Sequence, residues 1–253
     1  MITWFSDIDN TLVYSHRTHI AEEKVLVEKI NGAEQSFMTK YSYNSMRNMN
    51  INLVPVTTRT IEQYKRLFVF EESIYVKHAL VCNGAILLVD GCVDEEWKQE
   101  TSILANNGIK DLHIIKKDFG DYGIKSVEDF LFYFKAINPQ EEAAIYRKRY
   151  KNANVYIGYD KRKIYFLPKE INKGVSVQRY CKKYGTGTTI SSGDSEFDIS
   201  MLMVTDIAMG PDSLLHEIDS NVKMYSLGEK KIIANTICKN ILNIIKENEN
   251  ELK

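Results

Sequence analysis

The sequence predicts an α/β protein with a doubly wound parallel sheet and an inserted α+β unit. Short apolar segments alternate with helical segments over residues 1–84 and again over 169–253. Between these ranges, hairpin signals are mixed with helices, which is typical of a separate α+β unit. The chain has 253 residues, 44% of them hydrophobic and 26% charged. That composition is typical of a folded globular protein, and the length fits a core that carries a smaller inserted domain.

The first half of the core begins with residues 2–6 (ITWFS), an apolar and β-branched run that predicts a buried strand. Residues 25–38 contain Asn31-Gly32 between alternating segments, which predicts a small projecting hairpin. Thr60, followed three residues later by Gln63, predicts a capping box at a helix start. The other segments predicted in this half are a helix at 39–50, strands at 51–56 and 79–82, and a helix that ends near residue 68.

The inserted unit is expected at residues 85–168. Asp90-Gly91 predicts one hairpin, and Asp160-Lys161 predicts the turn of another. The segments predicted around these turns are helices at 95–106 and 126–137 and strands at 155–159 and 163–167.

After residue 169 the alternation of helices and strands resumes, and Gly185 predicts the end of the first of these helices. Residues 246–253 (KENENELK) are expected to form a solvated tail. The segments predicted in this half are helices at 173–184, 195–203 and 211–218, strands at 188–192, 206–209 and 222–226, and a terminal helix from about residue 231.

Composition excludes several classes of protein. The formal net charge of −1 gives no global attraction to nucleic acid or to an anionic membrane. No apolar run approaches the roughly 20 residues that a membrane span needs, and the N-terminus lacks the basic start of a signal peptide. We therefore expect a cytoplasmic protein without a membrane partner. The four cysteines have no CxxC or CxxH spacing, so we expect free thiols and neither disulfides nor a zinc site.

Polar residues that could take part in catalysis or binding follow the predicted core strands. Asp7 and Asp9 come directly after the first strand, and a carboxylate there can attack phosphorus while a second one transfers a proton. An Asp- and Asn-rich turn without catalytic role is the alternative. Thr57 follows the second strand and offers a hydroxyl and backbone N–H groups to an anion, although Thr is also an ordinary helix cap.

Two further segments lie in the second half of the core. Lys173 is predicted in the first turn of a helix, where the helix dipole disfavours a cation unless an anion lies nearby. Asp194 and Asp198, within GDSEFD, are one helical turn apart and offer the oxygen ligands that Mg²⁺ prefers. A solvated lysine and an acidic helix start are the alternatives.

Together and in this order, these segments resemble the four motifs of the haloacid dehalogenase superfamily. Asp7, Asp9 and Thr11 match its DxDxT motif, and Thr57, Lys173 and GDSEFD match the other three. The insertion resembles the α+β cap of the Cof-type and sucrose-phosphate-phosphatase-like members. Its flanks, Asn83-Gly84-Ala85 and NKGV at 172–175, resemble the segments that flank the cap in that subgroup. The resemblance implies a Rossmann-like core formed by residues 1–84 and 169–253 and a substrate-specificity cap at 85–168.

The same resemblance implies the roles of the site residues. Asp7 would be the nucleophile and Asp9 the acid and base. The chain departs from the subgroup at Thr58, where glycine is usual, so either Thr57 or Thr58 presents the hydroxyl. It also departs at Phe197, where asparagine is usual. The remaining implied roles are phosphate or substrate binding by Thr11, Thr57, Thr58, Arg59, Asn83 and Lys173, and Mg²⁺ binding by Asp7, Asp9 (through its backbone carbonyl), Asp194 and Asp198.

We therefore expect a Mg²⁺-dependent phosphatase that acts on a small phosphorylated metabolite, first of all a sugar or polyol phosphate, as a monomer or homodimer. A phosphomutase, or a weakened binding or regulatory protein as suggested by Phe197, are the alternatives. The basic and aromatic stretch YRKRYK at 146–151, with Lys161, Arg162 and Lys163, raises nucleic-acid binding as a third interpretation. A solvated cap face that attracts anionic substrate is favoured over it, so no nucleic-acid partner is expected.

Overall fold

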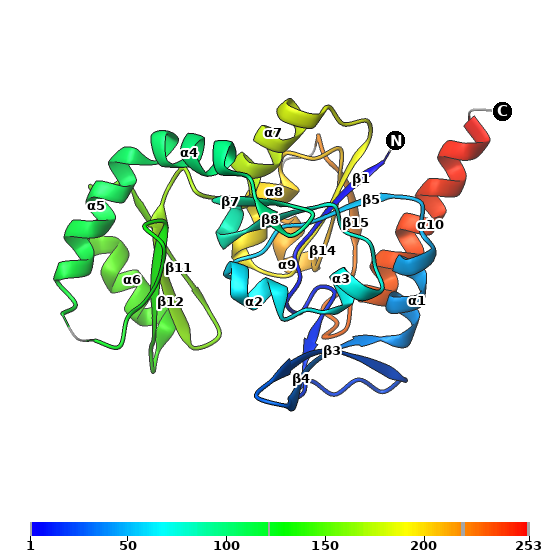
Figure 1. Ribbon diagram of the computed structural model, residues 1–253, viewed down its shortest axis with the longest axis horizontal. Coiled ribbons are helices and arrows are strands. Elements are labelled where there is room, and N and C mark those ends of the chain that lie inside the picture. Colours follow the sequence, from blue (N-terminus) through cyan, green and yellow to red (C-terminus); the bar gives the residue numbers. More distant parts are fainter. Residues whose placement is uncertain (1, 121, 219–220, 252–253) are drawn as a thin grey trace.

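The computed structural model describes residues 2–120, 122–218 and 221–251, which form two parts lying side by side (Figure 1). The larger part, the core, contains a parallel five-stranded sheet in the order β15-β14-β13-β1-β5. The predicted α/β class with a parallel sheet is confirmed. The strands of this sheet are β1 (Thr3–Ser6), β5 (Asn52–Pro55), β13 (Thr189–Ser192), β14 (Ile207–Gly210) and β15 (Lys223–Ser226).

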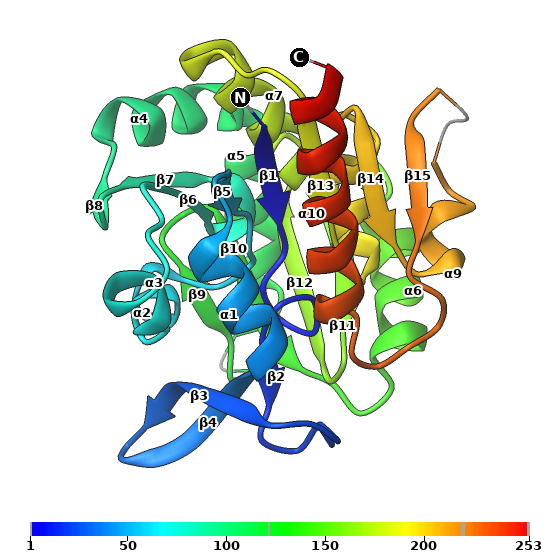
Figure 2. The same ribbon diagram turned by 90° about the vertical axis from the view of Figure 1, so that its right-hand side faces the viewer.

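The central strand β1 is buried on both faces, as its apolar sequence predicts. Because side chains alternate along a strand, Trp4 and Phe5 point to opposite faces. Trp4 packs in the cluster that includes residues of α10, and Phe5 packs in the cluster that includes residues of α7 and α8. Figure 2 shows α1 and α10 in front of the sheet. These helices are α1 (Lys40–Asn48), α7 (Lys173–Tyr184), α8 (Ile199–Leu202) and α10 (Ala234–Glu251).

The strand expected at 79–82 is present as β6 (His78–Val81), but it joins an antiparallel sheet with β7 (Ile86–Val89) and β8 (Cys92–Val93). It meets the parallel sheet through one isolated bridge between Val56 and Leu80. The range 85–168 expected for the cap therefore begins with a hairpin that is paired to β6.

The helix expected to end near residue 68 is two short helices, α2 (Ile61–Lys65) and α3 (Val69–Glu72). The predicted capping box at its start is confirmed, because the Thr60 side chain accepts from the Gln63 N–H and the Gln63 side chain accepts from the Thr60 N–H.

The predicted hairpin around Asn31-Gly32 is confirmed by β3 (Lys24–Ile30) and β4 (Ala33–Thr39). Both turn residues have positive φ, 51° and 80°, as an Asn-Gly turn between two strands requires. The short strand β2 (Tyr14–Ser15) pairs with β4 and completes a three-stranded sheet. This hairpin extends from the core beyond the end of β1 (Figure 2).

The smaller part, which we call the cap, comprises the elements from α5 to β12. Its antiparallel sheet has the order β11-β12-β10-β9, and α5 and α6 pack on one face. Helix α4 (Glu95–Leu104) leads into the cap but packs on the core, where Trp97 Nε1 donates to Gly84 O over 3.2 Å. The elements of the cap are α5 (Asn106–Lys117), β9 (Lys125–Val127), β10 (Leu131–Lys135), α6 (Pro139–Arg149), β11 (Val155–Asp160) and β12 (Lys163–Pro168).

The helix predicted at 126–137 is wrong, because this segment forms β9 and β10. The run Leu131–Lys135 (LFYFK) is rich in aromatic residues that fit a pleated sheet, and Phe132 and Phe134 point into the cap interior. A turn between the strands places Glu128 at φ 49°. Helices α5 and α6 have no counterpart in the sequence-based prediction, whereas the hairpin β11–β12 does.

In the second half of the core, α7 has the predicted bounds and ends at Gly185, whose φ is 65°. The segment expected as one helix at 195–203 is a 3₁₀ turn, η2 (Glu196–Asp198), followed by α8, and α9 (Asp212–Leu215) is shorter than expected. Helix α10 continues to Glu251, so most of the expected tail is helical and its last two residues lie outside the described chain.

All four cysteines are free, as expected. Within the described residues, no helix combines the length and apolarity that a membrane crossing requires.

Candidate active site

The polar segments predicted from the sequence meet at one edge of the parallel sheet. Asp7 follows β1, Thr57 follows β5 and Asp194 follows β13, and these strands are neighbours in the order β13-β1-β5. Because the strands are parallel, their carboxyl ends lie together, which is where open α/β sheets bind ligands. Helix α7, which follows the cap in the chain, places Lys173 at the same edge of the sheet.

Lys173 lies at the centre of this group. Its side chain is 1% exposed, and Nζ lies 2.5 Å from Asp7 Oδ1 and 2.6 Å from Asp198 Oδ1. The Asn172 side chain caps α7 by accepting from the Val175 N–H over 2.9 Å, which fixes the first turn that carries the lysine. Burial alone would lower the pKa of Lys173, but Asp198 and Asp7 raise it above its ordinary value. Lys173 is therefore a cation.

Asp198 is anchored by the loop that precedes it. Its Oδ2 accepts from the backbone N–H groups of Asp194 and Ser195 over 3.0 and 2.9 Å and from Ser195 Oγ over 3.0 Å. A Cβ at Gly193 would lie 2.3 Å from the Asp198 Cβ, so the close approach of this loop requires glycine. The GDSEFD spacing thus serves to fix the Asp198 carboxylate.

Three carboxylates form a compact cluster. Ligand oxygens of Asp7, Asp194 and Asp198 all lie within 4.8 Å of one another. Thr11 Oγ1 donates to Asp194 Oδ1 over 3.0 Å and to Asp7 Oδ2 over 3.4 Å, so the threonine of the DxDxT segment connects the loops that follow β1 and β13. Only the Lys173 ammonium contacts this cluster as a cation among the described residues, which leaves it with excess negative charge.

Burial and mutual repulsion act on the protonation of this cluster. Burial raises the pKa of Asp7 well above its usual range, and the charges of Asp198 and Asp194 add to this effect. Burial and the charge of Asp198 raise the pKa of Asp194 to about 7. Clustered carboxylate oxygens with unbalanced negative charge are the donor set that suits a hard divalent cation such as Mg²⁺.

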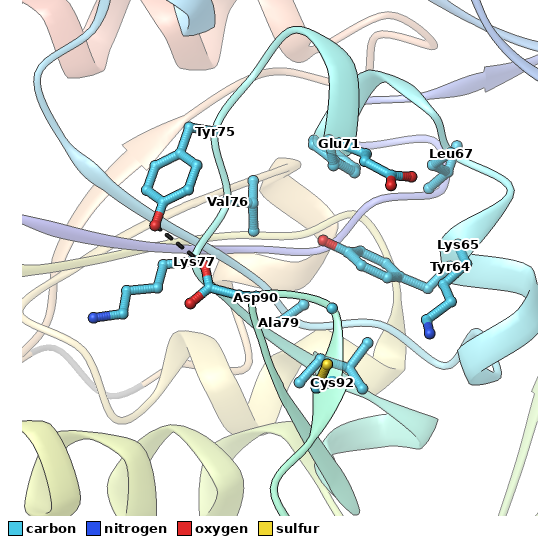
Figure 3. A pocket seen from close by; sticks show the side chains of 13 residues that line it. Tyr64, Lys65, Leu67, Glu71, Tyr75, Val76, Lys77, Ala79, Asp90 and Cys92 are labelled. Atoms are coloured by element: carbon cyan, nitrogen blue, oxygen red, sulfur yellow. Dashed lines mark hydrogen bonds between the residues drawn. The ribbon is translucent and has the colours of Figure 1, made fainter.

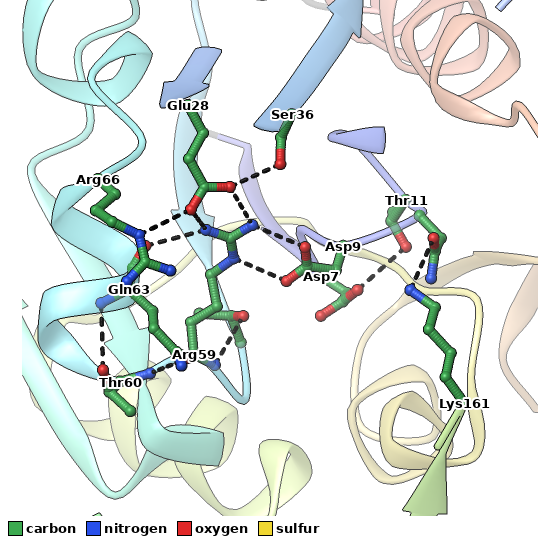
Figure 4. Close-up of polar contacts among 12 residues, drawn as sticks. Asp7, Asp9, Thr11, Glu28, Ser36, Arg59, Thr60, Gln63, Arg66 and Lys161 are labelled. Atoms are coloured by element: carbon green, nitrogen blue, oxygen red, sulfur yellow. Dashed lines mark hydrogen bonds and ion pairs between the residues drawn. The ribbon is translucent and has the colours of Figure 1, made fainter. Parts of the chain in front are cut away.

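Asp9 points away from this cluster and toward Arg59 (Figure 4). Arg59 Nε and Nη2 donate to Asp9 Oδ2 and Oδ1, each over 2.8 Å. Although burial would raise the pKa of Asp9, the hydrogen bonds and charge of Arg59 lower it from its ordinary value. Asp9 nevertheless remains accessible, since 43% of its side chain is exposed.

Arg59 is also bound to the projecting hairpin, a connection that the sequence did not reveal. Its two terminal nitrogens donate to Glu28 Oε1 and Oε2 over 3.0 and 3.1 Å (Figure 4). Glu28, on β3, further accepts from Arg66 Nε over 3.0 Å and from Ser36 Oγ over 2.6 Å, and its side chain is 2% exposed. In the sequence, Glu28 is one charged residue among several on a hairpin, so its burial left no local signal.

The two threonines after β5 take different positions. Thr58 lines the cavity beside Asp7, whereas Thr57 is 1% exposed and its Oγ1 accepts from the Arg59 N–H over 3.2 Å. Asn83 lies outside that cavity. Its Nδ2 donates to Ile171 O over 3.0 Å, and it thereby connects the end of β6 to the segment that precedes Lys173.

The cap closes over the carboxylates. The space beside them is only about 30 Å³, enough for about one water molecule. Two cap residues that the sequence did not single out, Asp160 and Tyr165, line it together with Phe197 of the core. The Phe197 ring lies edge-on to Tyr165 and Tyr156, with centroid distances of 5.4 and 5.8 Å. Phe197 is therefore part of the contact between core and cap.

A separate cavity of about 400 Å³ lies at the outer edge of β6–β8, next to α2 and α3 (Figure 3). Its lining includes Tyr64, Tyr75 and Cys92, and none of the site residues predicted from the sequence. The Tyr75 hydroxyl donates to Asp90 over 3.2 Å at its rim. Charged side chains line this cavity too, but the clustered Asp7, Asp194 and Asp198 are not among them, so the other cavity is the candidate active site.

Three solved structures are similar to this chain over nearly its whole length, with TM-scores that indicate a shared fold despite low sequence identity. Sucrose-phosphatase from Synechocystis sp. PCC6803 gives a TM-score of 0.61 at 16% identity, covering 96% of this chain and 97% of that one. A subclass IIB sugar phosphatase of the haloacid dehalogenase superfamily gives 0.62 at 17%, covering 96% and 99%. A trehalose-6-phosphate phosphatase related protein gives 0.55 at 16%, also covering 96% and 99%.

A search of curated proteins found no match. A family model for haloacid dehalogenase-like hydrolases matches residues 25–212, which is well over half of the chain. The resemblance inferred from the motifs and the match to the family model agree. The chain belongs to the haloacid dehalogenase-like hydrolase family.

Proposed function

We propose that this protein is a Mg²⁺-dependent phosphatase that hydrolyses a small phosphate monoester through an aspartyl-phosphate on Asp7. One observation carries the proposal. The buried Lys173 ammonium contacts both Asp7 and Asp198, within a cluster whose third carboxylate is Asp194. Placing a buried lysine among two buried carboxylates and a partly buried one is costly, and the ion pairs of a purely structural site do not offset that cost. A phosphoryl-transfer site needs this set of charges.

In this mechanism Asp7 attacks phosphorus, the bond to the leaving oxygen breaks, and Asp9 supplies the proton that the leaving alkoxide takes up. Asp9 then accepts a proton from the water that hydrolyses the aspartyl-phosphate. Arg59 lowers the pKa of Asp9, which favours the ionised form that acts as the base in the second step and disfavours the protonated form that the first step needs. Lys173 and the Thr57–Thr58 turn would hold the phosphoryl oxygens, with Thr58 as the residue that lines the cavity.

Asp7, Asp194 and Asp198 would hold the Mg²⁺ ion, together with the Asp9 backbone carbonyl that the family resemblance implies. When bound, the ion supplies positive charge that neutralises the phosphoryl oxygens. Thr11 orients two of these carboxylates through its hydroxyl. The Ser195 hydroxyl and two backbone N–H groups hold Asp198 in place.

For the substrate, the names of the structurally similar proteins favour a phosphorylated sugar or polyol. A small metabolite in the cytoplasm also fits a protein with free cysteines. A phosphomutase would use the same first step and differ in where the phosphoryl group ends, so phosphate release distinguishes it from a phosphatase.

The test is phosphate release from p-nitrophenyl phosphate and from a panel of sugar phosphates, with and without Mg²⁺. We expect turnover that needs Mg²⁺ and that Asp7→Asn abolishes, while Asp129→Asn, an exposed carboxylate in the cap, leaves it unchanged. If the Asp7→Asn variant retained turnover, Asp7 would be excluded as the nucleophile. Thr58→Ala and Thr57→Ala, compared in the same assay, identify the threonine that binds the phosphoryl group, and we expect the larger loss from Thr58→Ala.

A second candidate is a regulatory protein that binds a phosphorylated ligand without turning it over. Phe197 favours it, because an aromatic ring stands where the subgroup usually has an amide. Saturable binding of a sugar phosphate with no release of phosphate at any Mg²⁺ concentration would support this function over the first.

A further inference from the structure

The space available to the substrate has two compartments. The cavity of about 30 Å³ beside Asp7 has room for about one water molecule and none for a leaving group. It adjoins a cleft of about 330 Å³ between the cap, α2 and the projecting hairpin. Both are lined by Asp9, Thr58, Asp160 and Tyr165, so they lie next to each other. A phosphate monoester with its phosphorus at Asp7 would place its leaving group in this cleft.

The cap side of the cleft is one face of the cap sheet. Because side chains alternate, Phe132, Phe134, Ile164 and Phe166 point toward α5 and α6, and the residues between them point the other way. Lys135 and Lys163 are directly opposite each other on β10 and β12 and therefore share the face that looks into the cleft. Like charges in directly opposite positions destabilise a sheet.

Nothing in the described residues offsets this repulsion with an ion pair. The Lys163 ammonium lies 4.8 and 5.8 Å from the ring centroids of Tyr133 and Tyr165, so aromatic faces surround it. Burial lowers the pKa of Lys163 from its ordinary value, and the charges of Asp160 and Asp9 oppose this effect only in part. Lys161 and Arg162, in the turn between β11 and β12, line the same cleft, and Lys161 Nζ donates to the neutral Asn10 side chain over 3.2 Å.

The cations on the core side of the cleft differ in this respect. Arg59 is paired with Asp9 and Glu28, and Arg66 is paired with Glu28. Across the cleft, the cap contributes four cations, the residues Lys135, Lys161, Arg162 and Lys163, and one carboxylate, Asp160. The cap face therefore presents about three unbalanced positive charges to whatever fills the cleft.

The basic stretch at 146–151 does not share this property. It lies on and after α6, where Arg147 pairs with Glu196 and Arg149 pairs with Asp118. Both arginines of the segment at 146–151 thus have ion-pair partners within the protein, whereas the basic segment at 161–163 lines the cleft.

We propose that the substrate carries a second anionic group on its leaving portion, a phosphate or a carboxylate, which the cap binds through Lys135, Arg162 and Lys163. This inference rests on the proposed phosphatase function and narrows its substrate class from phosphates of uncharged sugars to phosphates whose leaving portion carries a second anionic group. An anion between Lys135 and Lys163 turns their repulsion into two attractive contacts. A neutral hydroxyl group offers no such compensation.

The experiment compares matched substrates that differ in one anionic group: fructose 6-phosphate with fructose 1,6-bisphosphate, and glucose 6-phosphate with 6-phosphogluconate. We expect kcat/KM to be at least about tenfold higher for the member of one pair that carries the second anionic group, which is the value of one charge-assisted contact. The bisphosphate arm and the carboxylate arm show which anion fits. The preference should fall about tenfold in Lys163→Gln and Lys135→Gln and stay unchanged in Lys148→Gln, on α6.

Turnover of the simple sugar phosphates separates the two levels of the argument. If they are hydrolysed but neither substrate with a second anionic group is preferred, the second-anion site is excluded and the proposed phosphatase function is retained. The same holds if the preference survives both lysine substitutions. If nothing is hydrolysed, the proposed function fails. Calorimetric binding of the same pairs to the Asp7→Asn variant with Mg²⁺ then decides the anion site, since equal affinities within a pair exclude it.

Discussion

At the scale of single residues, Arg59 joins the proposed acid to the hairpin. Its guanidinium donates to both Asp9 oxygens and both Glu28 oxygens, so one planar group fixes two carboxylates. Arg59 therefore holds Asp9 in one orientation while β3 holds Arg59. The position of the proposed acid depends on a strand that contributes no catalytic group.

Replacing Arg59 by methionine should be strongly destabilising. The change leaves Glu28 buried with Arg66 and Ser36 as its remaining partners, and breaking a buried pair on one side costs about 3–5 kcal/mol. Chemical unfolding measures this. Lys40→Met removes an ion pair with Glu23 that is largely exposed and should cost at most about 1 kcal/mol. The double variant with Glu28→Met should recover most of the stability, and no recovery would mean that the pair is not the cause.

Glu28 should also contribute a defined dependence of stability on pH. Burial alone would raise its pKa, but the hydrogen bonds and charge of Arg59 hold it below the ordinary value of 4.5. A lowered carboxyl pKa stabilises the fold above the unfolded-state pKa, and this contribution is lost as the pH falls through the folded-state pKa. The stability difference between wild type and Glu28→Gln should be constant from pH 7 to about 6 and shrink below about pH 4.5. Urea unfolding across this range tests it, and a gap that does not change with pH contradicts it.

Several residues of the candidate site could be predicted because local sequence patterns indicate them. Asp7, Lys173 and GDSEFD each follow a strand or begin a helix, and the structure brings them within contact distance. Glu28 and Asp160 could not be found in this way. Both reach the site through pairing between distant segments, and each stands among ordinary charged residues in the sequence.

At the scale of elements, the contact between cap and core depends on a few side chains around η2. Phe197 packs against two tyrosines of the cap, and a Cβ at Gly158 would lie 2.7 Å from its ring. The neighbouring Glu196 accepts from the Tyr156 hydroxyl over 2.8 Å and pairs with Arg147 over 3.0 Å. Phe197, which departs from the subgroup pattern, thus packs in the contact between the cap and the core.

Replacing Phe197 by alanine should loosen the cap without unfolding the core. The lost ring contacts and the cavity should raise amide exchange in β11 and β12 by at least about tenfold, since about 1.4 kcal/mol corresponds to that factor. Exchange in β13 should not change. Met203→Ala, a partly exposed side chain just after α8, is the matched control. Unchanged exchange in β11 and β12 would show that Phe197 does not hold the cap closed.

The elements that could be predicted are those with a clear period or clear punctuation. Asn31-Gly32 located a hairpin, and Gly185 located the end of α7. The segment 126–137 misled because its apolar residues fit a helix face or a strand equally well, and tertiary pairing with β12 decided the outcome. Whether the cap domain starts at 85 depends on β7, which pairs with β6 and not with the cap sheet. Asn83-Gly84 between the two strands is a hairpin signal for that pairing, which the sequence-based prediction did not use.

At the scale of the whole molecule, the clustered carboxylates should link metal binding to stability. The loops after β1 and β13 meet there, so an ion held by Asp7, Asp194 and Asp198 binds the folded chain and not the unfolded one. Mg²⁺ at 100 times its dissociation constant should add about 2.7 kcal/mol to the free energy of unfolding. Thermal unfolding with added Mg²⁺ and then a chelator measures this. Asp194→Asn should reduce the shift, and an equal shift in that variant would place the ion elsewhere.

The insertion of the cap between α4 and α7 has a consequence for how the protein is made. Asp7 and its partner Lys173 are separated by 166 residues, all of the cap among them. At the usual pace of the ribosome, on the order of ten seconds separates the synthesis of the two residues. Throughout that interval the central strand β1 lacks its neighbour β13, and its aspartate lacks a counter-charge. The nascent chain can therefore complete its catalytic centre only after the domain that will cover it has already emerged.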